Sequence, residues 1–94
     1  MNDVDVVHNE PASRYELQTP AGLAVLEYML DGDRLALVHT EVPRSAEGRG
    51  LGGALAKFAL DDARERGLRV VPMCAFIKAY IARHPAYAPL VAKR

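Results

Sequence analysis

The 94-residue sequence is poor in several features on which particular classes of protein depend. Its single cysteine excludes an internal disulfide and fits a reducing compartment. Neither sign of charge is in excess, because 12 basic residues balance 12 acidic ones. This balance argues against binding through bulk charge, so we expect neither nucleic acid nor a membrane surface among its partners.

Long apolar runs are also absent. No stretch approaches the roughly 20 apolar residues that a membrane-spanning helix needs. The first five residues, MNDVD, are acidic and lack the basic start and apolar centre of a signal peptide. We therefore expect a cytoplasmic protein. Half of the residues are hydrophobic, which predicts that the chain folds around one modest core.

The polarity pattern predicts the order of the elements. Residues 1–13 are polar and unpatterned, and we expect a flexible N-terminal arm there, followed by a single domain over residues 14–94. Apolar residues that alternate with polar ones, together with tight turns, predict an antiparallel meander of three strands. These strands are expected over residues 14–19, 23–30 and 34–42.

The hydrophobic period then changes to that of a helix. Residues 51–66 place apolar side chains at helical spacing. Asp62 and Arg66 are four residues apart, which suits an ion pair on a helix, and Gly67 is a residue at which a helix ends readily. A short apolar strand over 68–72 and a second helix over 74–83 follow. A right-handed crossover would make the last strand parallel to the third. The order β-β-β-α-β-α predicts an α+β fold with a mostly antiparallel sheet and one parallel pair.

The most informative segment is EGRGLGG, residues 47–53, at the start of the first helix. Glycines at such a place let backbone amides approach a ligand, and the positive end of the helix dipole favours phosphate. The segment therefore predicts a site for a pyrophosphate-bearing ligand, although a tight strand-to-helix turn is the alternative. It does not fit a dinucleotide-binding fold or a P-loop, because Gly52-Gly53-Ala54 stands where the latter needs Gly-Lys-Ser/Thr.

Residues 47–52 resemble motif A of the GNAT acetyltransferase superfamily, Gln/Arg-x-x-Gly-x-Gly/Ala. Together with HTEVP at 39–43, VPMC at 71–74 and HPAY at 84–87, the chain looks like the small stand-alone GNAT-like family. The resemblance covers roughly residues 14–91 and implies acetyl-CoA as the ligand. Glu47 departs from the motif, and the extra helices that build the acceptor side in longer GNAT enzymes are missing. The resemblance therefore implies a shallow acceptor pocket, or one that a partner or a bulky substrate completes.

The resemblance also implies where the coenzyme lies. The third and last strands would splay apart to hold the pantetheine arm, which would pair with backbone near Glu41 and Val42. The loop and Cys74 and Lys78 of the second helix would supply the remaining contacts. The coenzyme-binding residues implied are Glu41, Val42, Gly48, Arg49, Gly50, Leu51, Gly52, Gly53, Cys74 and Lys78.

Three residues are candidates for the chemistry. Tyr80 lies where the superfamily often has its general acid, although a packed aromatic side chain is the alternative. Cys74, at the first turn of the second helix, is either a nucleophile, a residue that lines the acyl pocket or a small buried side chain. Glu41, on one strand face with His39, is either a general base or part of an exposed sheet edge.

Other polar residues have simpler explanations. His84 before Pro85 fits a helix terminator. Arg44, Lys78 and Arg83 are solvated charges, or reach the 3′-phosphate of CoA. The histidines and the cysteine show no metal-ligand spacing, so we expect no metal.

Three functions remain open from the sequence. The first is an N-acetyltransferase that uses acetyl-CoA on an amine whose identity the sequence does not give. The second is a CoA- or acyl-CoA-binding module without turnover, and the third is an interaction domain that has lost the ligand. The intact glycine loop argues against the third, and the oligomeric state stays open.

Overall fold

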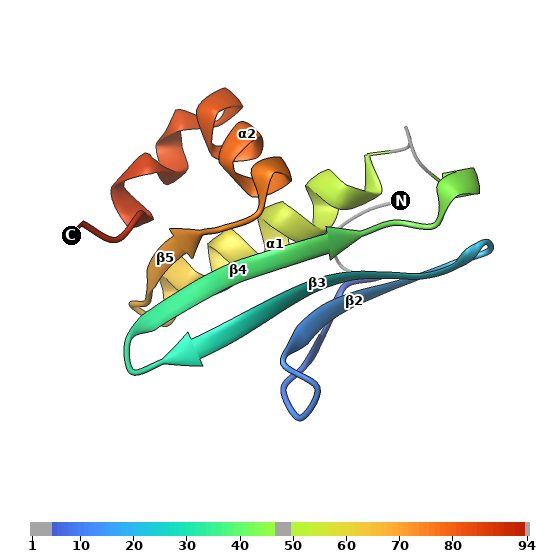
Figure 1. Ribbon diagram of the computed structural model, residues 1–94, viewed down its shortest axis with the longest axis horizontal. Coiled ribbons are helices and arrows are strands. Elements are labelled where there is room, and N and C mark those ends of the chain that lie inside the picture. Colours follow the sequence, from blue (N-terminus) through green and yellow to red (C-terminus); the bar gives the residue numbers. More distant parts are fainter. Residues whose placement is uncertain (1–4, 47–49, 94) are drawn as a thin grey trace.

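The computed structural model of the chain describes residues 5–46 and 50–93, and Figure 1 shows a twisted sheet with α1 along its far side. Five strands form the sheet in the order β1-β2-β3-β4-β5. The first four are antiparallel and β5 is parallel to β4. The sequence predicted the antiparallel meander of β2, β3 and β4 and the parallel β5, but not β1. The strands are β1 (Val7–Asn9), β2 (Arg14–Thr19), β3 (Gly22–Asp31), β4 (Arg34–Glu41) and β5 (Arg69–Pro72).

Helices cover one face of this sheet. Helix α1 (Leu51–Glu65) packs on β2, β3 and β4, and α2 (Ala75–Arg83) packs on β5 and α1. The apolar stripe of α1 and the inward-facing residues of the strands form the core, as amphipathic patterns dictate. The largest fully buried side chains are Tyr15, Leu17, Leu26, Leu35, Leu37, Leu55, Leu60, Val70 and Ile77. No helix in the described ranges is long and apolar enough to cross a bilayer.

Helix α1 begins and ends at glycines in the left-handed region. Gly50, with φ 75°, is the N-cap, and Gly67, with φ 69°, follows the last turn. The backbone amide of Leu68 bonds back to the carbonyl of Ala63 at 2.8 Å, which closes the helix end. The predicted stop at Gly67 is therefore confirmed.

The N-terminal segment differs from the expected flexible arm. Residues Val7–Asn9 form β1, which pairs with β2 at the edge of the sheet, and Val6 is buried in the core. His8 explains much of this docking: its Nε2 lies 2.6 Å from the Tyr28 hydroxyl, and its ring stacks on Tyr15 at 4.5 Å. These contacts join residues far apart in the chain, so the local sequence gives little sign of them.

The C-terminal segment packs back on the domain. It forms the 3₁₀ helix η3 (Pro85–Leu90), whose Tyr87 hydroxyl donates to Asp61 Oδ1 at 2.7 Å. Beyond it, Val91 bridges Val70, and the amide of Ala92 donates to the carbonyl of Val70 at 2.7 Å. This segment covers the outer edge of β5.

Candidate functional site

The parallel strands β4 and β5 part before β4 ends. Their pairing runs only from Arg34 with Arg69 to Leu37 with Pro72, whereas β4 continues to Glu41. After the last pair, the amides of the two residues that follow β5, Met73 and Cys74, both donate to the carbonyl of Leu37. The end of β4 therefore has a free edge toward β5 within the described part of the chain.

A β-bulge in β4 decides which side chains face the helices there. Glu27 pairs with His39 but Tyr28 pairs with Leu37, so Val38 is an extra residue in β4. The bulge reverses the alternation of faces. Thr40 therefore shares the helix-covered face with its buried partner Leu26, while His39 and Glu41 point to the opposite face and are exposed.

The start of α1 presents backbone amides that have no partner in the helix. The amides of Leu51, Gly52 and Gly53 precede the first turn's bond, which runs from Ala54 to the carbonyl of Gly50 at 3.0 Å. Gly50 supplies no side chain to cap them, and no acidic residue stands in the first turn. The helix dipole adds positive potential at the same place, so this end suits an anion.

Aromatic side chains of α2 lie against these glycines. A Cβ built on Gly52 would come within 2.9 Å of the Phe76 ring, and one on Gly53 would lie 3.6 Å from Tyr80. Gly52 thus lets the Phe76 ring lie closely over the start of α1 and also leaves the amides there open.

A cavity of about 460 Å³ lies among the end of β4, the start of α1 and α2. Its volume is within the range of small-molecule sites. Its lining joins residues that are distant in the sequence. The lining residues are Thr40, Val42, Ala46, Gly50, Leu51, Gly52, Gly53, Phe76, Tyr80, Arg83 and His84.

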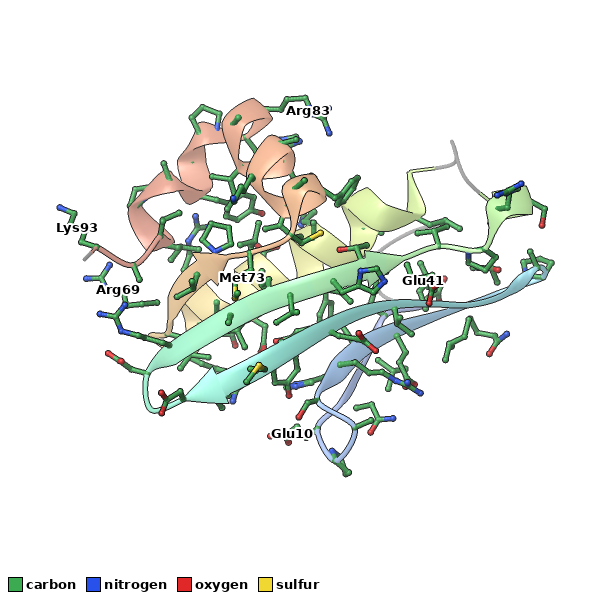
Figure 2. The ribbon with its side chains drawn as sticks, viewed as in Figure 1. Glu10, Glu41, Arg69, Met73, Arg83 and Lys93 are labelled. Carbon is green, nitrogen blue, oxygen red and sulfur yellow. The ribbon has the colours of Figure 1, made fainter. Side chains whose placement is uncertain are left out.

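The cavity brings together only part of the predicted site. Val42, residues 50–53 and Tyr80 line it, whereas Glu41 and Lys78 are exposed and are absent from the lining. Figure 2 shows Glu41 projecting at the end of β4. The predicted residues Gly48 and Arg49 lie outside the described residues.

Cys74 lies next to the cavity wall. Its Sγ is 3.6 Å from Thr40 Oγ1, so it meets the cavity through a residue of β4. Burial raises the pKa of the Cys74 thiol, but hydrogen bonding of its sulfur with the Thr40 hydroxyl and with the backbone of Ile77 and Phe76 outweighs burial and holds the pKa below its usual value. As the N-cap of α2, Cys74 is a thiol inclined to ionise.

Sequence reasoning missed Thr40 and Phe76 and assigned no site role to His84. His84 ends α2 as predicted, since its amide bonds to the carbonyls of Tyr80 and Ile81, but its ring also packs on Tyr80 at 4.1 Å and lines the cavity. Thr40 and Phe76 depend on the bulge and on the packing of α2 against α1. No local sequence motif predicts the bulge or the packing of α2 against α1.

Among the described residues, the lining has no carboxylate, and Arg83 is their one permanently charged side chain. The described lining therefore carries positive charge in a chain of zero net charge. Within residues 5–46 and 50–93, no three histidine, cysteine or acidic side chains gather as metal ligands would.

Comparisons with known proteins agree with this geometry. The family model for the GCN5-related N-acetyl-transferase matches residues 14–90. The chain is 43% identical over 63 residues to Protein NATD1 of Homo sapiens and of Gallus gallus, which covers 66% of this chain. The match spans 57% of the chicken protein and 56% of the human one, so the chain covers less than two thirds of these relatives.

The fold also matches a solved structure. This is the NMR solution structure of a GCN5-like putative N-acetyltransferase from Staphylococcus aureus, with a TM-score of 0.74 and 23% sequence identity. The match covers 100% of this chain and 93% of that one. This match supports the fold of the chain, a mostly antiparallel sheet with one parallel pair of strands.

Proposed function

The chain belongs to the GCN5-related N-acetyltransferase family, and on that premise we propose that it transfers an acetyl group from acetyl-CoA to an amine. The observation that carries the proposal is the cavity between the free edge of β4 and the uncapped start of α1. Acetyl-CoA has a diphosphate, an extended amide-containing arm and a thioester. Each of these parts has a counterpart along the cavity.

The diphosphate fits the start of α1. The free amides of Leu51, Gly52 and Gly53 would donate hydrogen bonds to its oxygens, and the helix dipole would add attraction. Gly50 leaves this approach open because no atom of the described residues lies within 4 Å of where its Cβ would be. The fit supports acetyl-CoA as the donor.

The pantetheine arm fits the free edge of β4 near Thr40 and Val42. An extended amide-containing chain can hydrogen-bond there as a strand would, in the place that β5 leaves open after Leu37. The thioester would then lie toward Cys74, where the two strands part.

In the reaction, the amine nitrogen attacks the thioester carbonyl carbon and a C–N bond forms. The C–S bond breaks, and its electron pair leaves with the coenzyme sulfur. Tyr80 would supply a proton to that sulfur, since its ring lines the cavity and the residue is only 8% exposed. The nitrogen would release one proton to solvent as the amide forms, and the Tyr80 phenolate would regain a proton from solvent. Replacing Tyr80 with Phe should slow turnover and leave CoA affinity intact.

Cys74 has two roles that fit its position. As a nucleophile, its thiolate would attack the thioester carbonyl carbon, so that acetyl-cysteine forms and the coenzyme leaves as a thiolate. In a second step the amine would attack the acetyl-cysteine, and the Cys74 thiolate would be released. As a lining residue, it would only shape the space around the acetyl group. Mass spectrometry after mixing with acetyl-CoA distinguishes the two roles. If Cys74 is the nucleophile, the natural chain gains the mass of one acetyl group and the Cys74→Ser variant does not.

One observation favours a second function, a CoA-binding module without turnover. The described lining holds no carboxylate to deprotonate an amine, because Glu41 faces the other side of the sheet. An enzyme built this way would need a neutral amine, or a base supplied by His84, by solvent or by the substrate.

Two measurements test the proposal. Calorimetric titration with CoA asks whether the ligand binds, and we expect a single site. Release of free thiol from acetyl-CoA, measured across a panel of amines, asks whether transfer occurs. If CoA binds and no amine raises thiol release above the uncatalysed rate, the binding module is the correct function.

A further inference from the structure

Arg83 stands apart from most arginines of this chain in having no ion-pair partner among the described side chains. Arg14, Arg64 and Arg66 all lie within 4.0 Å of a carboxylate. Arg34 and Arg69 donate to backbone carbonyls. Arg83 makes neither contact within the described residues, yet it lines the cavity.

The position of Arg83 at the end of α2 does not by itself imply a ligand. A cation in the last turn of a helix is stabilised by the dipole, so an exposed arginine there is ordinary. The cavity is what distinguishes it. Its lining includes Arg83 together with the residues that present the α1 amides, and no carboxylate stands among the described lining residues.

The order of residues along α2 says which part of a ligand Arg83 would meet. The helix starts at the acyl end, beside Cys74, and then passes the start of α1, with Phe76 against Gly52 and Tyr80 against Gly53. Arg83 follows Tyr80 by three residues, roughly 4.5 Å further along the helix axis. Figure 2 shows its side chain projecting from the outer end of α2.

We propose that Arg83 binds the 3′-phosphate on the ribose of CoA and so selects CoA over its 3′-dephospho form. The inference rests on the proposed function, since it takes the α1 amides as the site of the diphosphate. From there, the adenosine with its ribose phosphate is the part of CoA that continues away from the thioester. A guanidinium matches a phosphate in charge and in its paired donors.

Calorimetric titration of the intact chain with CoA and with 3′-dephospho-CoA tests this. The variants are Arg83→Gln and, as control, Lys93→Gln, which removes one positive charge well away from the cavity (Figure 2). We expect the natural chain and Lys93→Gln to bind CoA about tenfold more tightly than the dephospho form. Arg83→Gln should bind the two ligands equally, with its affinity for 3′-dephospho-CoA unchanged.

Other outcomes overturn the inference in ways that can be told apart. If Arg83→Gln keeps the preference for CoA, Arg83 does not contact the 3′-phosphate. If it weakens both ligands by the same factor, Arg83 acts on the diphosphate. If the natural chain binds CoA without preference, the 3′-phosphate has no cationic partner, whereas failure to bind CoA at all removes the proposed function as well.

Discussion

The ring of Phe76 lies over Gly52 so closely that a Cβ on that glycine would come within 2.9 Å of it. This contact joins the first turn of α2 to the first turn of α1. A glycine at position 52 is therefore favoured by the packing of Phe76 as well as by the proposed ligand. The adjacent Gly53 has ordinary space beside Tyr80, at 3.6 Å.

The two glycines should therefore respond differently to alanine. Gly53→Ala gains helix propensity without a clash and should raise the free energy of unfolding by up to about 1 kcal/mol. Gly52→Ala must displace the Phe76 ring, which is 36% exposed and can swing outward. The lost ring contact should cancel the gain in helix propensity, so the free energy of unfolding should stay unchanged. Urea unfolding measures both. Adding Phe76→Ala should remove the difference, and equal stability of the two single variants would refute the packing argument.

Gly50 offers a test of the anion site with a matched pair. Its φ of 75° favours glycine, and asparagine and aspartate tolerate that region to similar degrees. Gly50→Asp adds a negative charge beside the α1 amides, whereas Gly50→Asn adds nearly the same shape without charge. CoA should bind the Asp variant roughly tenfold or more weakly than the Asn variant. Similar affinities in calorimetry would mean that no phosphate lies there.

The ionisation of Cys74 should depend on Thr40. The pKa of the thiol lies below its usual value despite burial, because Thr40 and two backbone amides stabilise the thiolate. Alkylation by iodoacetamide, which follows the thiolate, should therefore begin at lower pH than for an ordinary cysteine. Thr40→Val should move the midpoint of the rate profile to higher pH, and Thr40→Ser should not. A common midpoint for the three proteins would contradict this role of Thr40.

The C-terminal packing should weaken in alkali. Burial and the hydrogen bond to Asp61 raise the pKa of Tyr87 to about 12. Because the folded-state pKa lies above the unfolded value, this contribution to stability is complete below pH about 10 and is lost as pH rises through about 12. Melting temperatures from pH 9 to 12 should fall less steeply for Tyr87→Phe than for the natural chain. Parallel slopes would show that Tyr87 is not responsible.

Much of the fold was open to prediction because its signals are local. The alternation in residues 14–19, the helical period from Leu51 and the stop at Gly67 each reflect a backbone preference that neighbouring residues reveal. The ion pair of Asp62 with Arg66, 3.0 Å apart, follows from helical spacing alone.

What the sequence could not provide depends on distant partners. Strand β1 has three residues, and its docking relies on His8 meeting Tyr28, 20 positions away. The bulge at Val38 is a property of two strands together, so a single strand's pattern leaves the face of Glu41 undecided. Phe76 and Arg83 reach the cavity only because α2 packs beside the start of α1.

On the proposed function, the uncapped amides of Leu51, Gly52 and Gly53 bind the diphosphate of CoA. A two-dimensional NMR titration of the labelled chain with CoA follows this contact residue by residue, since each backbone amide gives its own signal. We predict that these three amides show the largest chemical-shift changes, with smaller ones at Thr40 and Val42. Saturable changes centred on other residues, with these three amides unmoved, would contradict it.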